Sequence, residues 1–101
     1  MIHVLAILTA KPGKRAELLE AFHAVMPMVH AEDGCIEYAP AIDTDHAIAS
    51  ADFGPDSYVV IEKWATKEAL SAHVKTPHMA AYAAKSKDLI ANRILHVLES
   101  A

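Results

Sequence analysis

The chain has 101 residues, a formal net charge of −4 and one cysteine, and 53% of its residues are hydrophobic while 22% are charged. This length predicts a single domain over residues 1–101, and the composition excludes disorder, collagen-like repeats and a coiled-coil rod. The negative charge and the lack of a long basic run argue against nucleic acid and anionic membrane surfaces as partners.

With only Cys35, the chain can form neither an internal disulfide nor a cysteine-based zinc site, which fits a reducing cytoplasm. The apolar residues 1–10 are too few to span a bilayer and lack a basic leader, so we expect a strand and not a signal peptide. The high apolar share of such a small chain predicts a subunit interface, a ligand cavity, or both.

The first half of the chain predicts a strand, a helix and a second strand. Residues 2–9 are aliphatic and β-branched and end at a Lys-Pro-Gly turn, which is typical of a buried strand. Residues 14 to about 31 carry an amphipathic helical stripe of Leu18, Phe22, Val25 and Val29. Pro27 is expected to kink this helix or end its regular part. Gly34 then stops the helix before a strand over residues 35–42.

The second half begins with a polar segment, residues 43–57, which predicts a loop with a short strand around residues 48–53. Strict alternation then predicts a strand whose one face carries Tyr58, Val60, Glu62 and Trp64. Thr66 is the expected N-cap of a short helix. Thr76 and Pro77 begin a second helix that we expect to run to about residue 92, before a final strand over residues 93–99.

This order predicts an α+β sandwich in which the helices cover one face of a mostly antiparallel sheet. The other face still carries apolar side chains on the first and third strands, namely Leu5, Ile7, Val59 and Ile61. Such a face in water would be a large apolar patch, so we expect a second copy of the chain to cover it as a homodimer.

The best candidate for chemistry is the segment from Glu62 to Tyr82, which also holds Trp64, His73 and His78. His78 falls in the first turn of a predicted helix, where the helix dipole disfavours an imidazolium and keeps the ring available as a neutral base. A proton acceptor beside an apolar pocket with aromatic walls is the minimum needed to deprotonate a phenol. Purely structural roles stay open, with Trp64 in the core and His73 facing solvent.

The sequence gives little support for a nucleotide-binding site, a nucleophilic active site or a metal site. The chain has no GxGxxG motif, no Walker loop and no GxSxG elbow, and Cys35 has no base near it in the sequence. His46 lies near Asp43 and Asp45, but one imidazole in an acidic loop is more typical of a solvated turn than of a metal site. We therefore expect neither a metal nor a bound cofactor.

Four segments in this order, VLAILTAKPGK, EDGCIEYAP, DSYVVIEKW and HVKTPHMAAY, resemble the antibiotic biosynthesis monooxygenase family, in particular its small bacterial quinol monooxygenases. The resemblance covers essentially the whole chain. It implies a ferredoxin-like α+β fold whose sheets pair into a dimeric α/β barrel. It also implies oxidation of quinols or polycyclic phenols to quinones by molecular oxygen, with no flavin, haem or metal.

The resemblance also assigns roles by position. It makes His78 the base or hydrogen-bond acceptor for the substrate hydroxyl, Tyr38 or Tyr82 the donor to the developing oxygen anion, and Glu62 the group that orients an imidazole. Trp64 would stack on the substrate ring. The expected catalytic residues are thus His78, Tyr38, Glu62 and His73, and the expected substrate-binding residues are Trp64, Tyr82, Met79 and Phe22.

Two branches of the family would use this fold differently. Haem-degrading members place an asparagine and a haem-binding histidine where this chain has Ala6 and Tyr82-Ala83, so haem cleavage is not expected. An isomerase of a phosphorylated sugar derivative would need cations near the pocket, and Lys75, Lys85 and Lys87 leave that alternative open. An isomerase that uses the same histidine, and a non-catalytic barrel that binds a hydrophobic small molecule, are the remaining alternatives.

Overall fold

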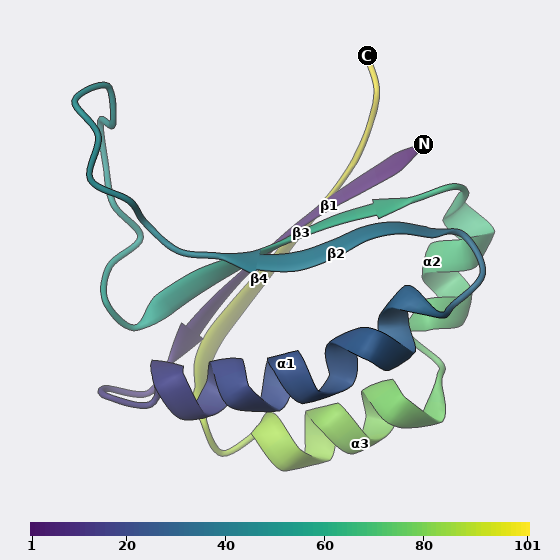
Figure 1. The fold of residues 1–101 in the computed structure, drawn as a ribbon, viewed down its shortest axis with the longest axis horizontal. Coiled ribbons are helices and arrows are strands. Elements are labelled where there is room, and N and C mark those ends of the chain that lie inside the picture. Colours follow the sequence, from purple (N-terminus) through teal and green to yellow (C-terminus); the bar gives the residue numbers. More distant parts are fainter.

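A computed structural model describes residues 1–101 as one four-stranded antiparallel sheet with three helices. All three helices lie on one side of the sheet, and the two chain ends lie near each other (Figure 1). The predicted ferredoxin-like α+β sandwich is confirmed. In chain order the elements are β1 (Ile2–Ala10), α1 (Arg15–His30), β2 (Cys35–Ala41), β3 (Ser57–Trp64), α2 (Lys67–His73), α3 (Pro77–Ser86) and β4 (Ile90–Glu99).

The strands lie in the order β2-β3-β1-β4, so β1 and β3 are central and β2 and β4 are edge strands. Val4 on β1 lies opposite Glu62 on β3 and Val97 on β4, and Glu62 in turn lies opposite Tyr38 on β2. Because side chains alternate along a strand, these residues share one face of the sheet. That face is the one the helices cover, as the alternation in β3 predicts.

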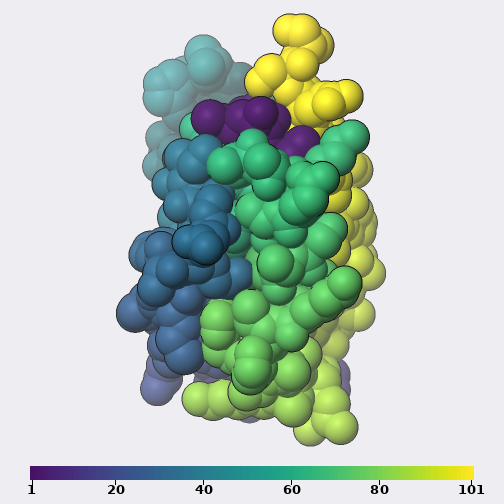
Figure 2. All heavy atoms as spheres, turned by 90° about the vertical axis from the view of Figure 1, so that its right-hand side faces the viewer, coloured from purple at the N-terminus to yellow at the C-terminus, as the bar shows by residue number.

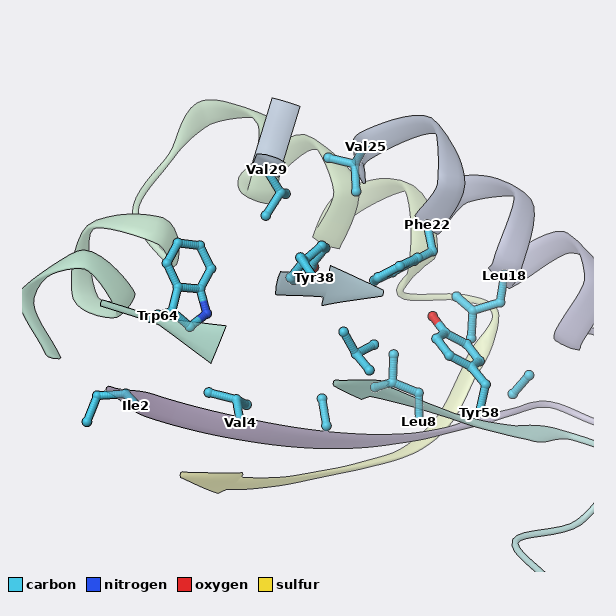
Figure 3. Close-up of a cluster of buried hydrophobic side chains, with 13 residues drawn as sticks. Ile2, Val4, Leu8, Leu18, Phe22, Val25, Val29, Tyr38, Tyr58 and Trp64 are labelled. Carbon is cyan, nitrogen blue, oxygen red and sulfur yellow. The ribbon is translucent and has the colours of Figure 1, made fainter. Parts of the chain in front are cut away.

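The core fills the space between the sheet and α1 (Figure 3). The predicted stripe of α1 is buried, and Phe22 in this stripe stacks on Tyr38, with 5.0 Å between ring centroids. Trp64 lies at one end of the core and Tyr58 at the other (Figure 3). Both are completely buried. The core thus clamps β2, β3 and α1 together and fixes where the strand side chains point.

The predicted end of the first helix near residue 31 is confirmed, whereas the predicted boundary between the last helix and the last strand is wrong. α1 continues through Pro27 to His30, since Pro27 lies on the exposed side of the helix, where water can hydrate the carbonyl that loses its partner. α3 ends at Ser86 and β4 already begins at Ile90. The backbone N–H of Leu89 donates to the carbonyl of Ser86 at 2.9 Å, which closes the turn between α3 and β4.

The helix starts follow the predicted caps. The hydroxyl oxygen of Thr66 accepts a hydrogen bond from the N–H of Ala69 at 3.1 Å, and that of Thr76 accepts one from the N–H of Met79 at 3.4 Å. These caps satisfy helix N–H groups that have no partner within the helix. They place the end of α2 and the start of α3 side by side over the sheet.

Residues 42–56 form an arm that projects beyond the sheet (Figure 1). The predicted short strand around residues 48–53 is absent. At the neck of the arm, the Asp43 carboxylate accepts hydrogen bonds from the N–H groups of Phe53 and Gly54 at 3.0 and 2.9 Å. These two bonds lower the pKa of Asp43.

β4 has little contact with the helices, and its residues 91–99 are exposed on both faces. Leu95 and Val97 point to the helix side, and Ile94 and Leu98 point to the outer face of the sheet. None of the three helices combines the length and the apolar character that crossing a membrane would require.

Candidate functional site

A largely apolar cavity of about 300 Å³ lies between the sheet and the helices. Its floor comes from three strands and includes Val4, Ala6, Leu8, Val60, Leu95 and Val97. Its roof comes from the three helices and includes Phe22, Leu70, Val74, Met79, Tyr82 and Ala83. Leu95 and Val97 line the cavity and are still 48% and 60% exposed, so the cavity opens to solvent along β4.

Three polar side chains gather at one end of this cavity: Tyr38 from β2, Glu62 from β3 and His73 from the end of α2. The centroid of the His73 ring lies 5.4 Å from that of Tyr38 and 4.6 Å from that of the Trp64 ring system beneath it. One oxygen of Glu62, Oε1, accepts a hydrogen bond from Nε1–H of Trp64 at 2.9 Å. All three side chains are buried among apolar neighbours, which makes this end of the cavity a low-dielectric site.

Each of these three residues keeps one polar atom free. His73 Nε2, the Tyr38 hydroxyl and Glu62 Oε2 make no hydrogen bond within the chain, whereas His73 Nδ1 and Glu62 Oε1 are both paired. The structure has no completely buried polar side-chain atom without a partner. The three free atoms therefore keep some accessible surface, and because their residues line the cavity, a ligand there can meet them.

A buried carboxylate supports His73 from behind. His73 Nδ1 lies 3.1 and 2.9 Å from the two oxygens of Glu32, and His78 Nε2 lies 2.8 Å from the second of these, Oε2. The Glu32 side chain is only 11% exposed. Glu32 follows α1, His73 ends α2 and His78 lies in the first turn of α3, so one carboxylate joins three elements.

Gly34 brings Glu32 to this position. Its carbonyl accepts a hydrogen bond from the N–H of Ala65 at 2.8 Å, and its φ of +81° is a backbone conformation that favours glycine. The turn after α1 thereby packs against the start of α2. Figure 2 looks onto this end of the molecule, where the blue segment after α1 meets the green of α2.

Burial controls the protonation of the free groups. It raises the pKa of Glu62, while the hydrogen bond from Trp64 and the charges of His73 and Arg93 act in the opposite direction. Burial also raises the pKa values of Tyr38 and Tyr82. At neutral pH both phenols are therefore hydrogen-bond donors and not anions.

The structure brings most of the predicted site residues together. Tyr38, Glu62, His73, Tyr82, Met79 and Phe22 all line the cavity. His78 and Trp64 do not line it.

His78 directly precedes Met79 on α3, about 100° away around the helix. With Met79 facing the cavity, His78 points to Glu32 and to a groove between α1 and α3. Trp64 is completely buried under His73, so it supports the site without forming its wall. Glu62 is hydrogen-bonded to Trp64, and it is Glu32 that holds the imidazoles.

Two residues of the site were missed from the sequence. The alternation of the last strand could have found Arg93, which shares a face with Leu95 and Val97 and lines the cavity opposite Leu8. Glu32 had no such signal, because it is 41 residues away from His73 in the chain. Lys75 and Lys87 do not line the cavity, and Lys85 lines the groove between α1 and α3. Arg93 is thus the only lysine or arginine in the cavity lining.

The donor set does not suggest a metal centre. No group of three or more histidine, cysteine, aspartate or glutamate side chains is arranged to hold a metal ion. In the Glu32 cluster, both imidazoles address the same carboxylate. The chemistry available at the site is proton transfer and hydrogen bonding in an apolar surrounding.

Comparison with known proteins agrees with this architecture. The profile of the family described as "Antibiotic biosynthesis monooxygenase" matches residues 1–85. "Probable quinol monooxygenase YgiN" of Escherichia coli (strain K12) is 35% identical over 101 residues, covering 98% of this chain and 97% of YgiN. The chain therefore belongs to the antibiotic biosynthesis monooxygenase family.

Solved structures show the same fold. Rv0793 from Mycobacterium tuberculosis superposes with a TM-score of 0.82 at 25% identity, covering 99% of this chain and 94% of Rv0793. PA3566 from Pseudomonas aeruginosa gives a TM-score of 0.82 at 24% identity, with coverages of 99% and 93%. The family and the name of the E. coli relative together support monooxygenase activity as the class of function.

Proposed function

We propose that the protein is a monooxygenase that oxidises quinols or polycyclic phenols to quinones with molecular oxygen and without a bound cofactor. One observation carries the proposal: His73 presents a free Nε2 to an apolar cavity while Glu32 holds its other ring nitrogen. The family and the similarity to a relative named as a quinol monooxygenase support the same conclusion.

The reaction needs no external reductant. Molecular oxygen reacts slowly with closed-shell organic molecules, but an electron-rich phenolate can itself transfer the first electron to O₂. One oxygen atom then bonds to a ring carbon and becomes a carbonyl as that carbon loses its hydrogen, and the other leaves as water. The substrate loses four electrons and O₂ gains four, so phenol and O₂ balance quinone and water. A quinol that keeps a free ring C–H follows the same balance, with the new oxygen entering as a hydroxyl, so quinol and O₂ balance hydroxyquinone and water. The protein has to deprotonate, desolvate and orient the substrate.

The free atoms of the cavity fit these tasks. His73 Nε2 accepts the proton of the substrate hydroxyl, the role that the resemblance gave to His78. The Tyr38 hydroxyl, kept neutral by burial, donates a hydrogen bond to the resulting oxygen anion. Phe22 and Met79 hold the ring between apolar walls, and the low dielectric strengthens each polar contact.

The shape of the cavity favours an elongated flat substrate. Glu62 lies opposite Val4, and Arg93 lies opposite Leu8. Because Val4 and Leu8 are four residues apart on β1, the backbone positions of Glu62 and Arg93 are about 13 Å apart along the strands. Arg93 forms no ion pair within the chain. A fused-ring quinol with one hydroxyl at His73 can direct its second oxygen toward Arg93.

We also propose a homodimer. The outer face of the sheet carries Leu5, Ile94 and Leu98 as exposed apolar residues, and β4 has a free edge. A second copy that covers this face would remove a large apolar area from water.

Oxygen uptake by the metal-stripped protein with chemically reduced menadione tests the proposal, with autoxidation measured in the absence of protein. We expect uptake well above that background, and a fall of roughly 100-fold or more in His73→Gln. His23→Gln, which alters an exposed histidine on α1, is the matched control and should keep full activity.

Isotope labelling separates oxygenation from simple oxidation. With ¹⁸O₂ and reduced menadione, one labelled atom should enter the product as the new oxygen of a hydroxyquinone and the other should leave as water. Unlabelled quinone together with hydrogen peroxide would contradict monooxygenation. Absence of uptake, with menadione still quenching Trp64 fluorescence, would indicate a binding protein instead.

A further inference from the structure

We propose that Glu32 is a positioning residue that acts through His73, and that His78 in turn holds Glu32. In this arrangement the carboxylate determines which ring nitrogen of His73 carries the proton. The inference rests on the proposed function, because it explains which tautomer is adopted by His73, the proton acceptor of that reaction. It concerns two residues that do not line the cavity at all.

The hydrogen bonds define the tautomer. An ionised carboxylate can only accept, so a ring nitrogen 2.9 and 3.1 Å from its oxygens must be the donor. Nδ1 of His73 therefore carries the proton. In the neutral ring this leaves Nε2 as an acceptor, and Nε2 is the atom that reaches the cavity. Glu32 is the hydrogen-bond partner of the His73 ring within the chain.

His78 completes the cluster by the same reasoning. Its Nε2 lies 2.8 Å from Oε2 of Glu32 and must donate to it. With one imidazole from α2 and one from α3, the carboxylate cannot turn away from His73 without losing a hydrogen bond. A carboxylate that is only 11% exposed would be unfavourable without such partners, and the two histidines supply them.

The charges around His73 suit a proton acceptor. When His73 takes a proton, its ring becomes an imidazolium between Glu32 on the Nδ1 side and Glu62, whose carboxyl group also lines the cavity. Both carboxylates stabilise that cation. The strand position of Arg93 is about 13 Å from that of Glu62 along the sheet, toward the other end of the cavity.

The decisive variant is Glu32→Gln, which keeps the shape of the side chain but introduces an amide donor. We expect kcat for reduced menadione to fall by about 100-fold, as expected when an imidazole base loses the group that fixes its tautomer. The affinity for menadione, measured by quenching of Trp64 fluorescence, should change less than about 3-fold because Glu32 does not line the cavity.

Nitrogen chemical shifts of the imidazoles provide a readout that does not depend on activity. In ¹⁵N NMR spectra the wild type should show His73 protonated at Nδ1, and Glu32→Gln should lose this pattern. A residue that only stabilises the fold would not change the tautomer of a folded variant.

One control variant and one variant with a smaller expected loss bracket the effect. Asp33→Asn removes the same charge one residue away, at an exposed position, and should leave kcat and the tautomer unchanged. His78→Leu removes the donor that holds Glu32 from α3, so kcat should fall in this variant, but by less than in Glu32→Gln.

Wild-type kcat in Glu32→Gln, or an Nε2-protonated His73 in the wild type, would overturn the proposal. The second result needs no variant, so it decides the matter even if Glu32→Gln does not fold. Wild type without turnover would refute the proposed function, and the tautomer measurement would then still test the role of Glu32.

Discussion

A Cβ atom on Gly34 would lie 2.6 Å from the Cβ of Ala69, which is closer than two carbon atoms can approach without a shift. The turn after α1 and the first turns of α2 therefore meet at a point that accommodates only glycine. Gly34 lies two residues after Glu32, and Ala69 lies four residues before His73. It sets the distance between the carboxylate and the imidazole that it holds.

Gly34→Ala should destabilise the fold by two separate effects, the left-handed backbone and the clash with Ala69. We expect a loss of roughly 2–4 kcal/mol in urea unfolding. Gly13→Ala is the matched control, because Gly13 also has a positive φ, of 76°, but has open space around it. It should lose only about 1 kcal/mol. Equal losses in the two variants would show that the close approach to Ala69 has no energetic weight.

The clash can be tested further by combining substitutions. Ala69→Gly removes the atom that a Cβ on Gly34 would meet. The double variant Gly34→Ala/Ala69→Gly should therefore be more stable than the sum of the two single changes predicts, by about 1 kcal/mol or more. If the stability changes of the two single variants simply add in the double variant, the contact between residues 34 and 69 is contradicted.

Glu62 should make stability depend on pH. Burial raises its pKa above the ordinary value of 4.5, so in this range the folded protein binds more protons than the unfolded chain. Stability from this group is therefore complete below 4.5 and is lost as the pH rises through the folded-state pKa. Glu62→Gln can still accept the Trp64 hydrogen bond but cannot ionise.

Urea unfolding at pH 4 and pH 8 measures this effect. Relative to wild type, Glu62→Gln should gain stability on going from pH 4 to pH 8. Glu20→Gln, at an exposed position on α1, serves as the control and should follow wild type. A constant difference between Glu62→Gln and wild type at both pH values would show that Glu62 does not titrate abnormally.

Arg93 should determine how well the cavity holds the far oxygen of a quinol. Arg93→Met should raise KM for reduced menadione by about 10-fold with little change in kcat, because a hydrogen bond to a charged group is lost from binding and not from the proton transfer. Lys87→Met removes a nearby positive charge that does not line the cavity and should leave KM unchanged. A fall in kcat alone would contradict this assignment.

The outer face of the sheet should hold two copies together. Ile94 is 45% exposed on this face, and Ile94→Glu should convert a dimer into a monomer in sedimentation experiments. Met28→Glu changes an apolar residue of α1 with a similar exposure of 48% on the helix side and should remain dimeric. Sedimentation of the wild type as a monomer would refute the dimer.

The sequence was sufficient wherever a local rule applied. The alternation of β3 placed Glu62 on the helix side, and the N-caps Thr66 and Thr76 marked the helix starts because each satisfies its own first turn. The start of β4 at Ile90 was missed because its first residues continue a helical pattern. Pairing with β1 makes them a strand instead.

The roles of the two histidines could not be separated by local rules. His73 and His78 belong to two short helices joined by a turn, and no periodicity relates the rotation of one helix to that of the other. The link to Glu32 depends on the packing of the turn after α1 against α2, a contact between residues far apart in the chain. Only the folded structure shows which imidazole faces the cavity.

The N–H groups of Phe53 and Gly54 clamp the arm by donating hydrogen bonds to Asp43. Residues 44–52 thus form a closed loop whose ends stay fixed whatever sequence lies between them. Doubling the length of a flexible loop adds only about 0.6 kcal/mol to the cost of closing it. The clamp lies beyond the last pair of β2 with β3, Ala41 with Val59. A reporter peptide or an affinity tag can thus be grafted into the arm while Tyr38 stays opposite Glu62 in the sheet.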